Sequence, residues 1–246
     1  AYCRRLLEEK SGRFSFGLEG KSGPGARHLH GEILSMDPRG SRLSMTFEGR
    51  TWELATPLVG SFNVMNLLGA QAMGLAMGLD PRDFAPLSKF TGVTGRLERV
   101  PSSAGLNAFV DYAHTPDALT KAISALRSAG FARIVTVFGC GGNRDRAKRP
   151  LMGEAVAKLT DVAVLTSDNP RNEDPQAIMQ DVLPGLVSCR EVVQEADRQK
   201  AIALAVAMLG PDDALLVAGK GHETYQLING VQHPFSDQAI LKELLS

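Results

Sequence analysis

The amino-acid sequence predicts a protein of the α/β class, in which a mostly parallel sheet is preceded by a part made of antiparallel strands and helices. From about Val100 onward, strand-like runs alternate with helical runs, which is the pattern of parallel strands joined by crossover helices. These strand-like runs are apolar at nearly every position, so we expect both faces of the sheet to be buried. Between residues 13 and 55, polar and apolar side chains alternate instead, which is typical of antiparallel strands.

In the first part we expect an antiparallel meander with strands over residues 13–16, 31–36, 42–47 and 51–54, separated by Gly, Pro, Asp and Ser. Residues 54–79 contain no charged side chain, but Pro57, Asn63, Asn66 and Gln71 argue against a membrane span. We interpret residues 61–79 as a helix packed on most sides. A shorter helix is expected from Pro81, with Asp80 as its N-cap.

In the second part the alternation predicts five strands and five helices. The strands are expected over residues 108–112, 134–138, 162–165, 192–193 and 214–218, and the helices over residues 116–128, 151–159, 175–186, 196–209 and 237–245.

Composition and charge exclude several classes of protein. The chain has 246 residues, which is between one and two domains at ~150 residues each. Lys plus Arg and Asp plus Glu each number 27, and this balance argues against a dedicated nucleic-acid or membrane-surface binder. Cys3, Cys140 and Cys189 form no CxxC pair, so a zinc ribbon and a thioredoxin motif are excluded, and an odd count suits a reducing compartment. We expect a cytoplasmic protein.

Four strands of the second part run directly into polar loops. These loops cover residues 111–117, 139–150, 166–171 and 219–223. Ligands of parallel sheets bind beyond the carboxyl ends of the strands, so we expect the chemistry of the protein at this edge.

The glycine-rich loop after the second strand matches no standard nucleotide motif. A dinucleotide fingerprint needs Gly where Arg144 stands, and a P-loop around Gly20-Lys21-Ser22 needs Gly where Ser15 stands. Four basic residues follow the loop glycines: Arg144, Arg146, Lys148 and Arg149. They predict either an anion site at a helix N-terminus or a solvated charged loop.

The loops over residues 166–171 and 219–223 carry groups of opposite charge. Asp168-Asn169-Pro170-Arg171 is a turn that presents a guanidinium group suited to a carboxylate, although an exposed turn arginine is the alternative. In the loop from Gly219, Glu223 is suited to an ammonium group, or else it begins a helix. Together these loops match a zwitterionic amino acid.

Other polar residues are weaker candidates. His114 and His222 lie at strand ends, whereas the remaining histidines are expected on the surface. Asn63 and Asn66 share one helix face, where they either satisfy the core or bind a base or ribose.

Six segments resemble the Mur ligases, most closely the members that add meso-diaminopimelate. They are SFNVMNLLGA, GVTGRLERV, VDYAHTPDAL, VFGCGGNRDRAKRPLMG, SDNPR and VAGKGHETYQ, and they occur in order between about residues 57 and 246. The resemblance implies that residues 1–99 are the last part of a central ATP-binding domain and residues 100–246 a Rossmann-like C-terminal domain. The P-loop, the Mg²⁺ ligands and the carbamoylated lysine of the family have no match here, so we expect a fragment of a longer protein. The match is loose over residues 1–56.

The resemblance also implies roles for individual residues. ATP contacts are carried over to Asn63, Asn66, Arg96, Asp111 and His114. Contacts to meso-diaminopimelate are carried over to Arg144, Asp168, Asn169, Pro170, Arg171, Gly219 and Glu223. No residue of the chain is assigned to catalysis or to a metal.

The activity that the resemblance implies is an ATP-dependent amide ligation in peptidoglycan precursor synthesis. UDP-MurNAc-dipeptide and meso-diaminopimelate would be the substrates, ATP and Mg²⁺ the cofactors, and the enzyme a monomer without nucleic-acid or membrane partners. A folylpolyglutamate-synthetase-like ligase and a non-catalytic α/β module that binds an amino acid or nucleotide are the alternatives. The isolated chain is expected to be inactive without a P-loop.

Overall fold

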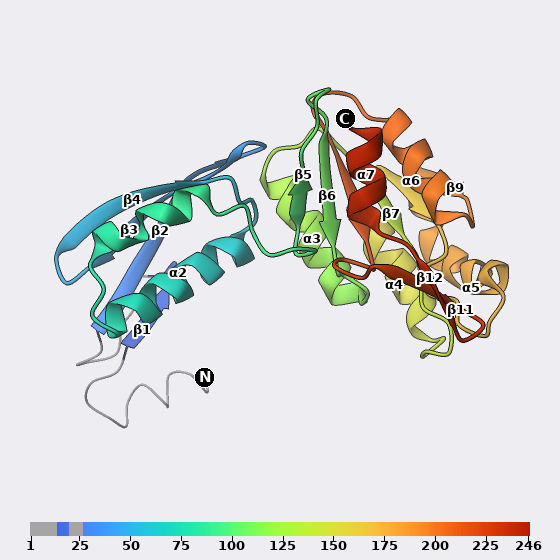
Figure 1. The fold of residues 1–246 in the computed structure, drawn as a ribbon, viewed down its shortest axis with the longest axis horizontal. Helices are drawn as coiled ribbons and strands as arrows, with labels where there is room; N and C mark the ends of the chain where they lie inside the picture. The colour runs from blue at the N-terminus through green and yellow to red at the C-terminus, as the bar shows by residue number, and fades with distance from the viewer. Residues whose placement is uncertain (1–13, 20–26) are drawn as a thin grey trace. The chain divides into compact units, whose positions relative to one another are not determined.

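The computed structural model describes residues 14–19 and 27–246, and the chain divides into two compact units, residues 1–91 and 92–246 (Figure 1). This division falls eight residues before the expected boundary between residues 99 and 100. The reason is a short strand, β5 (Glu98–Val100), which pairs antiparallel with β6 (Asn107–Asp111) and so joins the second sheet. Each unit is described here by itself.

The first unit contains a four-stranded sheet in the order β1-β2-β3-β4. Its strands are β1 (Phe14–Gly17), β2 (Arg27–Asp37), β3 (Gly40–Phe47) and β4 (Arg50–Thr56). The antiparallel pairing is confirmed for β2, β3 and β4. It is wrong for β1, which runs parallel to β2, because period-two patterning reports the faces of a strand and not its direction. Arg13, which was expected to begin this strand, lies outside the described residues.

Helix α2 (Ser61–Ala76) packs its apolar side chains against this sheet. Leu67 and Leu68 are buried together with Leu29 of β2 and Met45 of β3. The helix ends three residues before the expected end because Gly78 adopts a left-handed conformation with φ of 93°.

The second helical segment, η1 (Pro81–Lys89), starts with the expected cap. The Asp80 carboxylate accepts a hydrogen bond from the amide of Arg82, and the Asp83 carboxylate accepts one from the amide of Asp80, which completes a capping box. This segment is a 3₁₀ helix and contains Pro86, which cannot donate the hydrogen bond that an α-helix would require.

The second unit is built on a six-stranded sheet in the order β5-β6-β10-β7-β8-β9. All strands except β5 run parallel, as the sequence predicts. The remaining strands are β7 (Arg133–Phe138), β8 (Val162–Leu165), β9 (Glu191–Gln194) and β10 (Asp213–Ala218). The four strands that precede the polar loops, β6, β10, β7 and β8, are consecutive neighbours, so their loops emerge side by side at one edge of the sheet.

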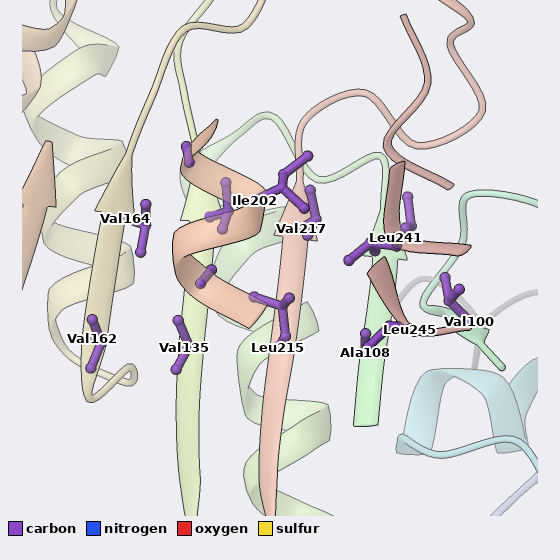
Figure 2. Close-up of a cluster of buried hydrophobic side chains, with 14 residues drawn as sticks. Val100, Ala108, Val135, Val162, Val164, Ile202, Leu215, Val217, Leu241 and Leu245 are labelled. Carbon is purple, nitrogen blue, oxygen red and sulfur yellow. The ribbon is translucent and has the colours of Figure 1, made fainter. Parts of the chain in front are cut away.

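Helices cover both faces of this sheet. They are α3 (Pro116–Ser128), α4 (Lys148–Ala157), α5 (Pro175–Val182) with the 3₁₀ turn η2 (Leu183–Leu186), α6 (Arg198–Ala207) and α7 (Asp237–Leu244). Figure 2 shows one buried face, where Ile202 of α6 lies over Val135, Leu215 and Val217, and Leu241 of α7 lies beside Ala108 of β6. Helix α3 packs against β7 and β10 and contacts α4. Within residues 14–19 and 27–246, no helix is long and apolar enough to cross a bilayer.

A two-stranded hairpin that the sequence reading missed follows the last sheet strand. Strands β11 (Tyr225–Ile228) and β12 (Val231–Pro234) pair antiparallel around Asn229 and Gly230. The alternative in which Glu223 begins a helix is therefore wrong, because residues 219–224 form a turn that enters β11. The asparagine-glycine pair is a hairpin signal, but half-buried strands of four residues give little periodicity.

A candidate ligand-binding site at the strand ends

The four polar loops of the second unit surround one cavity of about 470 Å³. Its walls come from the segments that follow β6, β7, β8 and β10, as the topology requires. Of the residues expected to bind an amino acid, the cavity is lined by Arg144, Asp168, Asn169, Arg171, Gly219 and Glu223. Pro170 does not line it. The carbonyl of Pro170 instead accepts a hydrogen bond from the amide of Glu173 and closes the turn behind Arg171.

Close backbone contact locks two of these loops together. The amide of Gly142 donates a hydrogen bond of 2.9 Å to the carbonyl of Asn169. A Cβ atom on Gly142 would lie 1.9 Å from the carbonyl oxygen of Pro170, so no other residue fits without moving the Asp168–Arg171 turn. Glycine at this position sets the distance between the basic and acidic sides of the cavity.

Arg171 is held by both its backbone and its side chain. Its backbone has φ of 54° and forms a bridge to the β11–β12 hairpin, with its amide donating to the carbonyl of Leu227. Its Nη1 atom donates a hydrogen bond of 2.8 Å to the carbonyl of Gly142. The guanidinium group is thereby presented in one orientation, as the turn chemistry predicts, and its charge has no carboxylate partner among the described residues.

The four basic residues after the glycine loop divide into two kinds. Arg144 and Lys148 line the cavity and form no ion pair with any residue that the structure describes. Arg149 also lines it, but its side chain is only 1% exposed and pairs with Glu173 and Asp181 at 2.8 Å each. Arg146 pairs with Asp181 as well. Of the two interpretations left open, an anion site remains possible only for Arg144 and Lys148, because Arg146 and Arg149 are paired with acidic residues some 30 positions further along the chain.

The Arg149 pairs have a clear electrostatic effect. The hydrogen bond from Arg149, together with one from the amide of Asn143, lowers the pKa of Glu173 to about 2. The pKa of Asp181 is lowered by hydrogen bonds from Arg149 and Arg146. The ion pairs of these carboxylates with Arg149 hold the start of α4 beside α5.

Another part of the cavity wall is acidic and contains Asp168 and Glu223. The Glu223 carboxylate accepts a hydrogen bond of 2.9 Å from the Asn169 side-chain amide. Asp168 lies beside it, with a side chain only 9% exposed, and Gly219 adopts φ of 118° next to the Asp168 carboxylate. A ligand in the cavity thus meets both the carboxylates of Asp168 and Glu223 and the guanidinium group of Arg171.

Sequence reasoning missed Lys220, which lies behind the acidic wall. Its ammonium group is fully buried and donates hydrogen bonds of 2.9 Å to Asn169 Oδ1 and to the carbonyl of Tyr225. A lysine between two glycines carries no pattern by itself, and only its burial beside Asp168 and Glu223 shows its importance.

Cys140 lines the same cavity as a neutral thiol. Burial, with a further contribution from the nearby Asp168 carboxylate, raises its pKa to about 12. Its Sγ atom lies 3.5 Å from Met152 Sδ, so it contributes a soft apolar patch to the wall.

The candidate nucleotide residues of the second unit gather around Tyr112. The Arg96 guanidinium lies 4.8 Å from the centre of the Tyr112 ring, and the rings of His114 and His222 lie 4.6 and 5.3 Å from it. The Asp111 carboxylate accepts hydrogen bonds from the amides of Leu97 and Ala113, while burial raises its pKa.

The other two candidates belong to the first unit and differ in exposure. Asn63 is buried and donates a hydrogen bond of 2.9 Å to the carbonyl of Val59, which is the arrangement of an amide that satisfies the core. Asn66, one turn later, is exposed and is available to a ligand.

The described residues hold no group of three or more His, Cys, Asp or Glu side chains placed to bind a metal ion.

The fold is that of an α/β domain whose strand ends surround a cavity lined by groups of both charges. Residues 95–221 match the family model described as Mur ligase, glutamate ligase domain, and the chain belongs to the Mur ligase family.

Curated relatives share one printed name, UDP-N-acetylmuramoyl-L-alanyl-D-glutamate--2,6-diaminopimelate ligase. The protein of Lawsonia intracellularis is 58% identical over 242 residues, covering 98% of this chain and 50% of the relative. That of Chlorobaculum tepidum is 48% identical over 221 residues, covering 88% and 43%. The chain thus spans about half the length of the curated relatives it matches.

Solved structures support the same fold. A diaminopimelate ligase of the same name aligns with a TM-score of 0.71 and 33% identity, over 94% of this chain and 47% of that one. A folylpolyglutamate synthase from Thermotoga maritima aligns with a TM-score of 0.62 at 17% identity, over 79% and 45%, which shows a shared fold only.

Proposed function

We propose that this chain is the amino-acid-binding part of an ATP-dependent ligase that joins meso-diaminopimelate to UDP-MurNAc-L-Ala-D-Glu. The observation that carries the proposal is one cavity lined both by Arg171 and by the carboxylates of Asp168 and Glu223. The printed names of the relatives supply the substrate pair, and the family supplies the type of reaction.

The charge pattern fits the ends of diaminopimelate, each of which carries an ammonium and a carboxylate group. Glu223 and Asp168 accept the ammonium, and Arg171 donates to the carboxylate with the nitrogens not used by Gly142. Arg144 lines the same cavity and receives the second carboxylate. A planar guanidinium group suits this role because it offers two parallel donors to one carboxylate.

The same geometry discriminates against lysine. Lysine has the length of diaminopimelate but lacks the distal carboxylate, so its binding would leave the Arg171 guanidinium without its partner in a half-buried site. An unpaired charged donor of this kind costs on the order of 1–3 kcal/mol, which is enough for selection between two similar amino acids.

The reaction proceeds through an acyl phosphate. The terminal carboxylate of the dipeptide attacks the γ-phosphorus of ATP and releases ADP. The free amine of diaminopimelate then attacks the acyl carbon, phosphate departs, and the amine loses a proton as the amide forms. The cavity contributes by holding the amino acid in one orientation, and positioning alone can lower such a barrier by several kcal/mol.

For ATP we propose contacts from Arg96, Asp111 and His114 in the second unit. In the first unit, the exposed Asn66 stays a proposed contact, whereas the buried Asn63 side chain already serves the core. Arg96 and His114 flank the Tyr112 ring, which supplies a flat surface beside two groups able to bind phosphate or ribose oxygens. Mg²⁺, which balances the charge of the phosphates when bound, would be held by residues outside this chain. We further propose that the protein acts in the cytoplasm as a monomer.

The test is ligation by the protein that contains this chain, supplied with ATP, Mg²⁺ and UDP-MurNAc-L-Ala-D-Glu. Diaminopimelate is expected to support phosphate release and tripeptide formation, and lysine is expected to support far less. Equal use of the two amino acids, or glutamylation of a folate instead, would contradict the proposal.

A further inference from the structure

The buried cation Lys220 has no place in the substrate contacts described so far, because it is fully buried and does not line the cavity. It nevertheless touches every acidic or amide group of the ammonium-binding wall. Its Nζ atom lies 2.9 Å from Asn169 Oδ1, 3.3 Å from Asp168 Oδ1 and 3.6 Å from Glu223 Oε2.

Lys220 also fastens this wall to the β11–β12 hairpin. Nζ donates to the carbonyl of Tyr225, and the Asn169 Oδ1 atom that it contacts accepts a second hydrogen bond from the amide of Leu227. The hairpin holds the neighbouring turn through Gln226, whose side chain donates to the carbonyl of Asp168. One ammonium group therefore connects the loop after β10, the turn after β8 and the hairpin.

The charges around Lys220 do not cancel completely. Lys220 offsets one of the two carboxylates, Asp168 and Glu223, so the wall retains one negative charge. Arg198, the other fully buried cation near Gly219, does not change this balance, because it forms two hydrogen bonds of 2.8 Å with Asp237. One remaining negative charge matches one incoming ammonium group.

The Asp168 carboxylate depends on Lys220 in particular. Its Oδ1 atom is buried and accepts no hydrogen bond from the part of the chain that the structure describes, so its nearest compensation is the charge of Lys220 at 3.3 Å, with a further contribution from the more distant charge of Arg198. An uncompensated buried carboxylate is costly and moves or becomes neutral. Either outcome removes the fixed negative charge that the cavity offers to a ligand.

We infer that Lys220 is a positioning residue that sets the affinity for diaminopimelate through Asp168, Asn169 and Glu223 without touching the substrate. The inference rests on the proposed function and extends it to a residue behind the cavity wall. Its expected signature is a selective rise in the KM for diaminopimelate, since the reacting groups and the nucleotide contacts stay in place.

The experiment uses Lys220→Gln in the protein that contains this chain, because an amide still donates to the Tyr225 carbonyl while the charge is lost. Lys158→Gln, which removes an exposed lysine of the same unit, is the matched control. In Lys220→Gln we expect the KM for diaminopimelate to rise at least tenfold, while the KM for ATP stays within twofold of wild type. In Lys158→Gln we expect the KM for diaminopimelate to stay within twofold of wild type. Should Lys220→Gln not fold, as checked by circular dichroism, Lys220→Met provides the same comparison.

A double-mutant cycle with Glu223→Gln separates this role from general destabilisation. If Lys220 acts through Glu223, the double variant raises the KM by less than the product of the two single effects. Independent effects, a KM within twofold of wild type, or an equal rise in the KM for ATP would overturn the inference. Failure of the wild-type protein to use diaminopimelate would instead overturn the proposed function, and the inference with it.

Discussion

Two arginines in the cavity wall of the second unit show how neighbouring charges decide the role of a side chain. Arg149 forms ion pairs with Glu173 and Asp181. Among the described residues, the Arg171 side chain donates hydrogen bonds only to carbonyl oxygens. Arg149 therefore stabilises the fold and Arg171 is free to bind a carboxylate. Sequence alone does not separate them, because Glu173 and Asp181 lie 24 and 32 residues beyond Arg149 and are brought to it only by the packing of α5 on α4.

The first prediction concerns the acid stability that Glu173 confers. Its pKa is lower in the folded chain, at about 2, than its ordinary value of 4.5, so its stabilising contribution is complete above 4.5 and is lost as the pH falls toward 2. Glu173→Gln should therefore show a smaller fall in Tm than wild type between about pH 5 and pH 2. Glu243→Gln, at an exposed position of α7, should follow wild type. Parallel curves for wild type and Glu173→Gln would contradict the assignment.

A second prediction concerns the thiol in the cavity wall. Because burial raises the pKa of Cys140 to about 12, almost none of it is thiolate at neutral pH. Iodoacetamide should alkylate Cys189, which is partly exposed, at least tenfold faster than Cys140. Peptide mass spectrometry after short exposure measures the two rates. Comparable labelling of the two cysteines would show that the wall opens readily.

At the scale of elements, strand and helix patterning predicted most of the second unit. The bounds of α3 and β8 agree with the expected ranges, and the other long elements differ by a few residues at their ends. The short elements were missed because they show little periodicity: β5 is three residues long, and β12 is four residues long and exposed throughout. The direction of β1 was also wrong, since alternation does not distinguish parallel from antiparallel partners.

The candidate site was predicted in part, and the part that was missed also depends on contacts between distant segments. Parallel topology brings the polar loops to one edge, and so Arg144, Asp168, Asn169, Arg171 and Glu223 could be expected to meet. Lys220 could not, because its importance comes from full burial and from contacts with the turn after β8 and with the hairpin.

Gly142 provides a test of how the loops fit together. Gly142→Ala would place a Cβ atom 1.9 Å from the carbonyl oxygen of Pro170, and the turn that carries Arg171 must then move. Overpacking of this kind costs about 1–3 kcal/mol of unfolding free energy, and the KM for diaminopimelate should rise as well. Gly210→Ala, where the nearest atom is 3.5 Å away, is the control and should be nearly neutral. Denaturant unfolding and steady-state kinetics measure both effects, and equal behaviour of the two variants would contradict the packing described.

At the scale of the whole molecule, a net charge of zero conceals a segregation of charge. In the second unit, Arg144, Lys148 and Arg171 form no ion pair with any described residue and line the same cavity as Asp168 and Glu223. Overall neutrality is compatible with a charged cavity, because exposed pairs such as Arg27 with Glu48 and Arg42 with Glu53 cancel in charge and have little energetic consequence.

The chain by itself should not catalyse ligation. It contains no GxxxxGK[ST] segment, the loop that cradles the phosphates of ATP in P-loop enzymes, although it contains the proposed amino-acid cavity. Incubation of the 246-residue chain with ATP, Mg²⁺, diaminopimelate and UDP-MurNAc-L-Ala-D-Glu is expected to release no phosphate above background. Measurable tripeptide formation by this chain alone would show that its phosphate-binding residues have been overlooked.

The selectivity of Arg171→Ala, measured in the protein that contains this chain, tests the central claim most directly. The ratio of kcat/KM for diaminopimelate to that for lysine is compared with wild type and with Arg190→Ala, an exposed arginine of the same unit. If Arg171 binds the distal carboxylate, this ratio falls at least tenfold in Arg171→Ala and is unchanged in Arg190→Ala. An equal loss of activity toward both amino acids would contradict the account.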